Sequence, residues 1–246
     1  MGVTTAPIRT YIGAAILIPV YIFPTGGGTS AEYVSFFNIA SQNTDLPIYA
    51  IVNPNSGPGT SISSSYTSVM SKYADNGVQT IGYIYTSYGA RSVVDMKADI
   101  DKWVSFYPSI MGMFLDECPT ANNATYLSNL AEVTAYCHSL GLGLVIGNPG
   151  TTPDPNYYTQ NAADVFVVKE SASVPTAEYL QATGTKERRS VIIHSQAAWN
   201  AADFDMMQTN CQYVYMTDDA SSYFDSFSGY MENMLSDLRA DSRNYA

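Results

Sequence analysis

Positive charge is scarce in this sequence. Lysine and arginine number 11 against 22 aspartates and glutamates, so the chain of 246 residues carries a net charge of −11 at pH 7. Only 13% of the residues are charged, about half of the roughly 25% that is usual in a globular protein. Because proteins bind nucleic acid through clustered cations, this composition excludes nucleic acid as a partner. A surface made polar by neutral groups is typical of secreted and sugar-handling proteins.

Cysteine, histidine and the usual cofactor motifs are also scarce. The three cysteines, Cys118, Cys137 and Cys211, can form at most one disulfide and provide no zinc site. The two histidines are isolated and have no acidic cluster at ligand spacing, which argues against a catalytic metal. The sequence contains neither a Gly-x-Ser-x-Gly elbow nor a phosphate-binding loop. We therefore expect no metal and no cofactor.

A long apolar run is missing as well. The longest, residues 12–23, contains Pro19 and is shorter than the roughly 20 residues that cross a bilayer, so no membrane span is expected. The first residues are polar and do not form a signal peptide. We interpret the chain as the mature part of a secreted or cell-surface protein, and the sequon Asn123-Ala124-Thr125 is compatible with a secretory route.

The hydrophobic residues, 46% of the chain, are arranged in a regular alternation. Short runs rich in β-branched and aromatic residues alternate with longer stretches in which apolar residues recur at helical spacing. The predicted strands cover residues 14–21, 46–52, 80–85, 111–115, 142–146, 164–168, 191–194 and 213–216. Helices are predicted after a cap at Ser30 and over residues 64–75, 92–107, 122–140, 197–208 and 224–239, with a short helix near Tyr157. A turn is expected after the sixth strand.

This alternation predicts a fold. Several strands, such as residues 14–21 and 165–168, are apolar on both faces, as in a parallel sheet covered by helices. Eight strand-and-helix units of this length fit a (β/α)8 TIM barrel. A doubly wound open sheet is the rival, but no Gly-x-Gly-x-x-Gly follows the first strand. Because no linker divides the chain, we predict one barrel domain over residues 1–246, and we expect a monomer.

In such barrels the active site lies at the carboxyl ends of the strands. Asp116 and Glu117 close an otherwise apolar run, and Glu170 follows a second one. Two carboxyl groups from separate strands that meet in one cleft are the minimum apparatus of a glycosidase. Side chains alternate along a strand, so only one of the adjacent pair faces the axis unless the strand end bends. The alternative is that these carboxylates cap helices or form salt bridges, and the pair Asp218-Asp219 is expected in a solvated loop.

Neutral residues at other strand ends suit a sugar. Tyr85 and Tyr88 can stack on sugar rings, although most of the tyrosines are expected to fill gaps between helices and sheet. Asn53 and Asn148 can bind hydroxyl or N-acetyl groups, but each precedes a proline and is equally well explained as a turn residue. His194 also lies at a strand end and is a candidate for substrate binding.

Five segments carry a family resemblance. They are Ile18-Pro-Val-Tyr-Ile-Phe-Pro24, Asn53-Pro-Asn-Ser-Gly-Pro-Gly59, Gly82-Tyr-Ile-Tyr-Thr-Ser-Tyr-Gly-Ala-Arg91, Asp99-Ile-Asp-Lys-Trp103 and Gly112-Met-Phe-Leu-Asp-Glu117. Together and in this order, they resemble the spherulin-4-like family, which includes glycoside hydrolase family 135. The resemblance implies a secreted or surface-attached fungal barrel without a metal. It also implies endo-acting cleavage of α-1,4-linked N-acetylgalactosamine in galactosaminogalactan, an exopolysaccharide of fungal biofilms.

The family's functional acidic positions fall on Asp116 and Glu117 and, less directly, on Glu170. We predict retaining hydrolysis, with Asp116 as nucleophile and Glu170 as acid/base. Glu117 would hold a neighbouring hydroxyl or tune Asp116, and the roles of Asp116 and Glu117 can be exchanged. A polymer with free galactosamine is cationic, which fits the negative chain. The alternatives are a non-catalytic carbohydrate-binding protein of the cell surface and a glycosidase for another α-linked hexosamine or galactose polymer.

Overall fold

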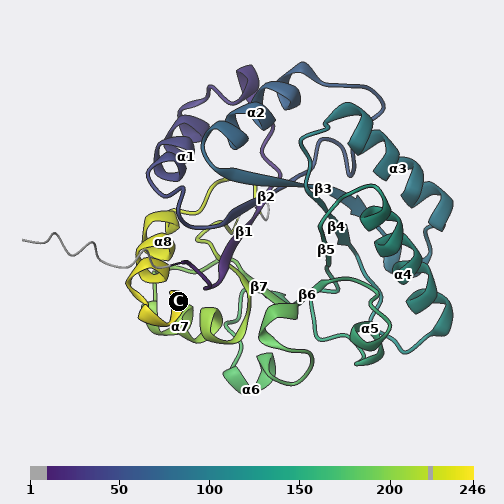
Figure 1. The fold of residues 1–246 in the computed structure, drawn as a ribbon. Helices are drawn as coiled ribbons and strands as arrows, with labels where there is room; N and C mark the ends of the chain where they lie inside the picture. Colours follow the sequence, from purple (N-terminus) through teal and green to yellow (C-terminus); the bar gives the residue numbers. More distant parts are fainter. Residues whose placement is uncertain (1–9, 221–223) are drawn as a thin grey trace, which may run out of the picture.

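Eight parallel strands close into a barrel in the order of the chain (Figure 1). The computed structural model describes residues 10–220 and 224–246. The strands are β1 (Ala15–Val20), β2 (Ile48–Val52), β3 (Val78–Tyr85), β4 (Gly112–Asp116), β5 (Leu144–Gly147), β6 (Val165–Ser171), β7 (Arg189–Ile193) and β8 (Tyr213–Met216). The barrel closes where Ala15 pairs with Tyr213. The predicted (β/α)8 barrel is therefore confirmed.

Helices follow the strands and surround the barrel (Figure 1). They are α1 (Ala31–Ser41), α2 (Ser64–Asp75), α3 (Val93–Phe106), α4 (Ala124–Ser139), α5 (Asn156–Thr159), α6 (Ala177–Leu180), α7 (Ala201–Asn210) and α8 (Met231–Ala240). Short 3-10 turns lie at Thr25–Gly27, Ser87–Gly89, Lys186–Arg188 and Ser242–Asn244. Within residues 10–220 and 224–246, no helix has the length and apolar character needed to cross a membrane.

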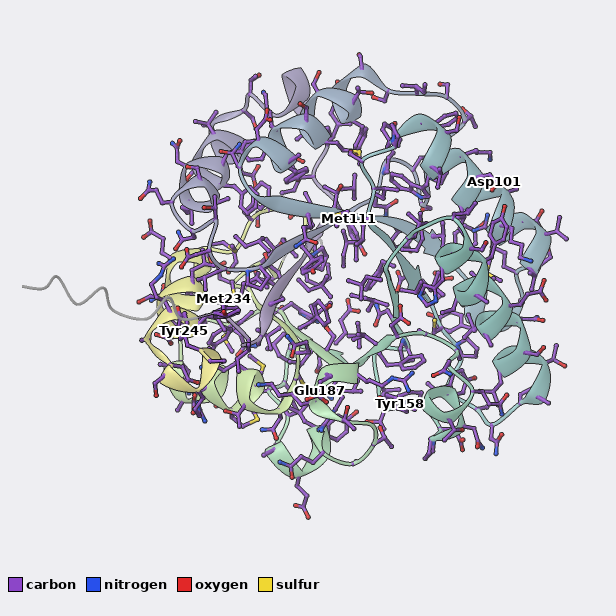
Figure 2. All side chains as sticks on the ribbon, in the orientation of Figure 1. Asp101, Met111, Tyr158, Glu187, Met234 and Tyr245 are labelled. Carbon is purple, nitrogen blue, oxygen red and sulfur yellow. The ribbon has the colours of Figure 1, made fainter. Side chains whose placement is uncertain are left out.

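Side chains fill the ring of strands and the layer between strands and helices (Figure 2). The contact of β3 with α3 shows how the two faces of a strand are used. The indole of Trp103 is fully buried, and its Nε1 donates a hydrogen bond of 2.9 Å to the Tyr83 carbonyl. Gly82 permits this approach, because a Cβ there would lie 2.7 Å from the indole. Gly82 thus faces α3, and the next residue, Tyr83, faces the barrel interior.

Several expected boundaries were wrong, and local hydrogen bonds explain two of them. Residues 224–230 form a loop instead of the first turns of the last helix, because the backbone N–H groups of Phe224 and Ser226 donate to the Asp219 carboxylate. The helix α7 begins at Ala201 instead of at residue 197, because the Asn200 side chain caps the helix by accepting from the N–H groups of Ala202 and Asp203. Ser30 precedes α1 but makes no side-chain cap. The segment after β6 contains a helical turn, α6.

The three cysteines Cys118, Cys137 and Cys211 are all buried and all free. Burial raises the pKa of both Cys137 and Cys211 to about 12. Since no two of them are bonded, no cross-link contributes to the stability of the described fold. The barrel is held together by its packed core and by the strand ladder.

Candidate active site

Asp116, the last residue of β4, lies at the centre of the candidate site. The Tyr83 hydroxyl donates a hydrogen bond of 2.7 Å to its Oδ2. The Asn148 side-chain Nδ2 donates one of 2.8 Å to its Oδ1. The donors come from the two strands that flank β4, because Tyr83 belongs to β3 and Asn148 follows β5. Both oxygens of Asp116 therefore face donors, an arrangement that suits an ionised carboxylate.

Glu170, in β6, meets Asp116 through the same amide. Its Oε2 accepts a hydrogen bond of 2.6 Å from Asn148 Nδ2. Burial raises the pKa of Glu170, the Asn148 hydrogen bond lowers it, and the negative charge of Asp116 raises it again, with a net increase. The structure thus brings together two predicted catalytic carboxyl groups whose surroundings differ. One is surrounded by donors, and the other is biased toward its protonated form.

A register irregularity in β6 turns Glu170 toward Asn148 and Asp116. Val167 pairs with Ser190, but Glu170 pairs with Ile192, because the register shifts between Val167 and Lys169. In a regular strand, residues three apart lie on opposite faces. Ser190 and Ile192 are two apart and share a face, so the bulge brings Glu170 to the same face as Val167.

Glu117 has a left-handed backbone, with φ of 54°. Its carbonyl accepts hydrogen bonds from Thr86 Oγ1, at 2.6 Å, and from the Tyr88 N–H, at 2.8 Å. The end of β4 therefore bends, so the regular alternation of side chains along the strand does not extend to Glu117. The charge of Glu117 contributes to the raised pKa of Tyr83, after burial and the charge of Asp116.

The left-handed backbone at Glu117 should make the free energy of unfolding sensitive to the residue at this position. A bulky residue in this region costs about 1–3 kcal/mol, and a β-branched one fits worst. Glu117→Val should therefore lower the free energy of unfolding by about 1–2 kcal/mol relative to Glu117→Gln. In Glu117→Gly the relief of strain is offset by the entropy of the unfolded chain, so its stability should match that of the Gln variant. Urea denaturation measures all three, and a Val variant as stable as the Gln variant would contradict a strained bend.

Two tyrosines that were not among the predicted site residues lie beside the carboxyl pair. Tyr83 is 6% exposed and bonds Asp116. Tyr21, just after β1, lies edge-on to Tyr83, with ring centroids 5.7 Å apart. Burial and then the charges of Asp116 and Glu170 raise the pKa of Tyr21 well above its ordinary value. The sequence did contain a signal for Tyr83. It lies two residues before the predicted site residue Tyr85 and therefore on the same face of β3.

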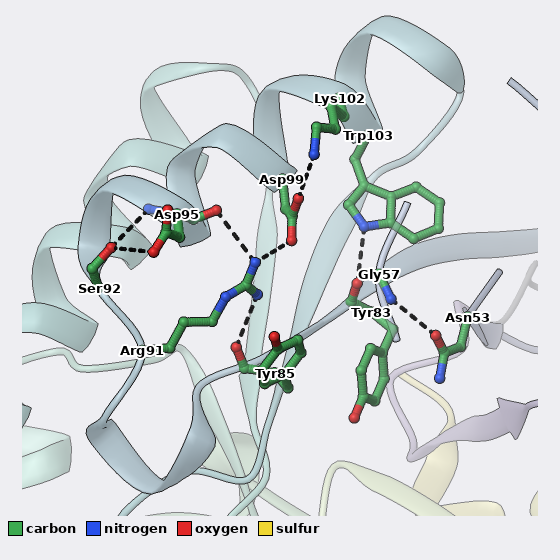
Figure 3. Close-up of polar contacts among 10 residues, drawn as sticks. All are labelled: Asn53, Gly57, Tyr83, Tyr85, Arg91, Ser92, Asp95, Asp99, Lys102 and Trp103. Atoms are coloured by element: carbon green, nitrogen blue, oxygen red, sulfur yellow. Dashed lines mark hydrogen bonds and ion pairs between the residues drawn. The ribbon is translucent and has the colours of Figure 1, made fainter. Parts of the chain in front are cut away.

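Two of the five predicted substrate-binding residues, Tyr85 and Tyr88, lie at and just after the end of β3. The Tyr85 ring is covered by the Arg91 guanidinium, 4.3 Å from the ring centroid, and the Tyr85 carbonyl accepts a hydrogen bond from Arg91 (Figure 3). Asp99 on α3 holds the same guanidinium in an ion pair. Tyr88 is 66% exposed, in the 3-10 turn after β3. Tyr85 thus ends β3 beside Asp116, its partner in the sheet, and Tyr88 lies in the turn that follows.

Asn148 bonds the carboxyl pair, and the remaining two, Asn53 and His194, have local partners. The Asn53 side-chain oxygen accepts a hydrogen bond of 3.1 Å from the Gly57 N–H, which is a turn role (Figure 3). His194 Nδ1 lies 2.8 Å from Ser195 Oγ, and burial lowers the pKa of His194. Asp219 was expected in a solvated loop, but it is 6% exposed and anchors the loop after β8. The expectation was wrong for Asp219, whose carboxylate accepts from the backbone N–H groups of Phe224 and Ser226, whereas Asp218 is exposed as expected.

The thiol that follows the acidic pair is turned away from the cleft. Cys118 is buried, and its Sγ donates to the Leu115 carbonyl at 3.1 Å. Burial raises the pKa of this thiol well above its ordinary value, so it remains protonated and unreactive. Across residues 10–220 and 224–246, no three His, Cys, Asp or Glu side chains are grouped to hold a metal ion.

Comparison with known families decides the relationship. The sequence model of the spherulation-specific family 4 matches residues 15–238. Spherulin-4 of Physarum polycephalum is 32% identical over 248 residues, which cover 92% of this chain and 70% of that protein. The chain belongs to the spherulin-4 family. The resemblance seen in the sequence is thereby confirmed.

Solved structures of other proteins have the same barrel fold as this chain. Aspergillus clavatus Sph3, solved in complex with GalNAc, superposes with a TM-score of 0.83 at 23% identity, over 93% of this chain and 98% of that one. A GH36 α-galactosidase, AgaA of Geobacillus stearothermophilus, solved with stachyose, superposes with a TM-score of 0.55 at 10% identity, over 94% of this chain and 43% of that one. At these identities the likeness concerns the barrel alone.

Proposed function

We propose that this protein is a glycoside hydrolase of the retaining type. The observation that carries the proposal is the amide of Asn148, which donates to Asp116 and to Glu170 at the same time. Two carboxyl groups held in one cleft, one suited to the ionised form and the other biased toward the protonated form, are what glycoside hydrolysis requires.

The separation of the two groups supports retention. Retaining enzymes hold their carboxyl groups roughly 5–5.5 Å apart, and inverting ones roughly 6.5–9.5 Å. Asp116 Oδ1 and Glu170 Oε2 accept hydrogen bonds of 2.8 and 2.6 Å from the same nitrogen, Asn148 Nδ2. The distance between these two oxygens therefore cannot exceed the sum of the two bond lengths. That sum lies below the range of inverting enzymes, so the pair fits a retaining enzyme.

The reaction then has two steps. Asp116 attacks the anomeric carbon while the glycosidic bond breaks, and Glu170 gives its proton to the departing oxygen. This leaves a sugar ester on Asp116 and an ionised Glu170. Glu170 next takes a proton from water, whose oxygen attacks the anomeric carbon and releases Asp116. Glu117 would hold a hydroxyl of the same sugar or tune Asp116, and the exchange of roles between the two neighbours is tested in the Discussion.

For the substrate, we propose an exopolysaccharide that contains N-acetylgalactosamine and galactosamine, cleaved internally at α-1,4 linkages. Three observations support this choice. The superposed Sph3 structure holds GalNAc. The exposed ring of Tyr88, whose backbone N–H donates to the Glu117 carbonyl, provides aromatic surface next to the acidic pair, and such surface packs against sugar C–H groups. The net charge of −11 attracts a polymer with free amines. We also propose that the protein acts as a monomer outside the cell, where such polymers occur.

Digestion of a panel of purified polysaccharides tests this function. The panel should contain galactosaminogalactan, its fully N-acetylated form and a neutral galactan, with release of reducing ends and product masses as the readouts. Oligosaccharides from the first two polymers are expected, and cleavage of galactosaminogalactan should slow as salt is added. Binding of the polymer without new ends, unchanged in the Asp116→Asn protein, would instead favour a non-catalytic carbohydrate-binding protein. Cleavage of the galactan alone would move the substrate to another class.

A further inference from the structure

Asn148 has no free hydrogen-bond donor for a substrate. Its side chain is an amide with two N–H donors and one carbonyl oxygen. The two donors go to Asp116 Oδ1 and Glu170 Oε2, and the carbonyl oxygen accepts from the Gly150 N–H at 2.9 Å. The residue is only 7% exposed. Substrate recognition by this amide would require that it release one of the two carboxyl groups.

The orientation of this amide is fixed by its neighbours. Turning it over would aim its carbonyl oxygen at both carboxyl groups and its NH2 at the Gly150 N–H. The contacts with Asp116 and with the Gly150 N–H would then join like to like, at a cost for each buried group that loses its partner. The contacts therefore define which end of the amide faces the carboxyl pair.

The backbone around Asn148 is fastened to both strands that carry the carboxyl groups. On the side of β4, the Asn148 N–H donates to the Leu115 carbonyl at 2.7 Å, and the Cys118 N–H donates to the Asn148 carbonyl at 2.9 Å. On the side of β6, the Glu170 N–H donates to the Gly150 carbonyl at 3.0 Å. The segment thus bridges the two halves of the site, with its side chain between the carboxyl groups.

We infer that Asn148 is a positioning residue, which sets the distance between Asp116 and Glu170 by donating to both carboxyl groups at once. The inference rests on the proposed function and replaces the substrate-binding role expected for Asn148 from the sequence. The acidic and phenolic groups that face Glu170 are Asp116 on β4, Tyr83 on β3 and Tyr21 after β1. None of these supplies a positive charge, so Asn148 is the neutral donor that allows the two carboxyl groups to approach.

Substitution of Asn148 separates positioning from substrate binding. Asn148→Ala removes the donor from both carboxyl groups, so the pKa of Glu170 should rise and the alkaline limb of the pH profile of kcat/KM should move to higher pH. Asn148→Asp places a third carboxyl group there, so the alkaline limb should move further still. In both variants kcat should fall at least tenfold, while KM changes less than threefold. A rise in KM with both limbs unmoved would show that Asn148 binds substrate, and would overturn the inference.

A second readout does not depend on activity. With glutamate labelled at the carboxyl carbon, NMR follows the titration of Glu170, and the spectrum of Glu170→Gln assigns its signal. The pKa of Glu170 should increase from wild type to Asn148→Ala and again to Asn148→Asp. Asn200→Ala is the matched control, because Asn200 also accepts backbone N–H bonds but caps the exposed start of α7. It should leave the titration of Glu170 unchanged.

The two proposals can fail separately. If the wild-type protein cleaves none of the polysaccharides, the hydrolase function fails, and the NMR titration still tests whether Asn148 controls the carboxyl pair. If the wild-type protein cleaves its polymer and the pKa of Glu170 is the same in all Asn148 variants, the positioning role is wrong and the hydrolase function stands.

Discussion

Asp116→Asn should reduce kcat on the polysaccharide by a factor on the order of 10⁴ and leave the fold intact. The variant keeps the shape of the side chain but removes the nucleophile. Its amide oxygen can still accept from Asn148, and its NH2 can donate to the Tyr83 hydroxyl oxygen, which takes either role. Both contacts around residue 116 are therefore satisfied. Release of reducing ends gives the rate, and thermal unfolding checks the fold.

The product formed with azide identifies the nucleophile. In Asp116→Ala the gap admits a small anion, which would attack the anomeric carbon from the side that Asp116 occupied. With a substrate that has an activated leaving group, the expected product is a glycosyl azide of inverted anomeric configuration. If Glu117→Ala gives this product and Asp116→Ala does not, the two neighbours exchange roles. The control is Asp95→Asn on α3, whose carboxylate accepts from Ser92 on the exposed surface (Figure 3).

The barrel could be predicted because its signal is repeated along the chain. Apolar runs with β-branched residues mark strands wherever helices cover both faces of the sheet. Helix α2 (Ser64–Asp75) and strand β8 (Tyr213–Met216) have the predicted boundaries. The start of the last helix could not be found in this way. Phe224 and Phe227 have helical spacing, but the N–H of Phe227 bonds the distant Glu32 and that of Phe224 bonds Asp219, contacts that only the folded chain brings together.

The candidate site was partly accessible from sequence for a topological reason. A closed parallel barrel brings all carboxyl ends of its strands to one face, so Asp116, Asn148 and Glu170 could be placed together from their positions alone. The bulge in β6 and the left-handed backbone of Glu117 could not be foreseen. Both depend on partners from neighbouring segments. Tyr83 differs from Tyr85 only by lying one layer deeper in the barrel, and composition carries no signal for depth.

Glu170→Gln should slow cleavage of the natural polymer by about 10²–10⁴-fold, because glutamine cannot protonate the leaving oxygen. Activity of the wild-type protein should fall as the pH rises through the raised pKa of Glu170, and the variant should lose this alkaline limb. A substrate whose leaving group needs no proton should form the sugar ester at a nearly normal rate. Azide should then release that ester with net retention of configuration, the opposite of the Asp116→Ala product. Near-normal cleavage of the polymer by Glu170→Gln would remove Glu170 from the mechanism.

The same substitution should stabilise the protein at neutral pH. Burial and the charge of Asp116 raise the pKa of Glu170 in the folded state. A carboxyl group whose pKa is higher folded than unfolded favours the folded state at low pH, and that contribution is lost as the pH rises through the folded pKa. Glutamine does not ionise, so the Glu170→Gln protein does not lose this stability as the pH rises. The melting temperatures of the two proteins should therefore be close at pH 4 and differ at pH 8 in favour of Glu170→Gln. A wild-type protein that is more stable than the variant at pH 8 would mean that the ionised carboxylate is well compensated, and that Glu170 does not keep the proton that the first step of the reaction requires.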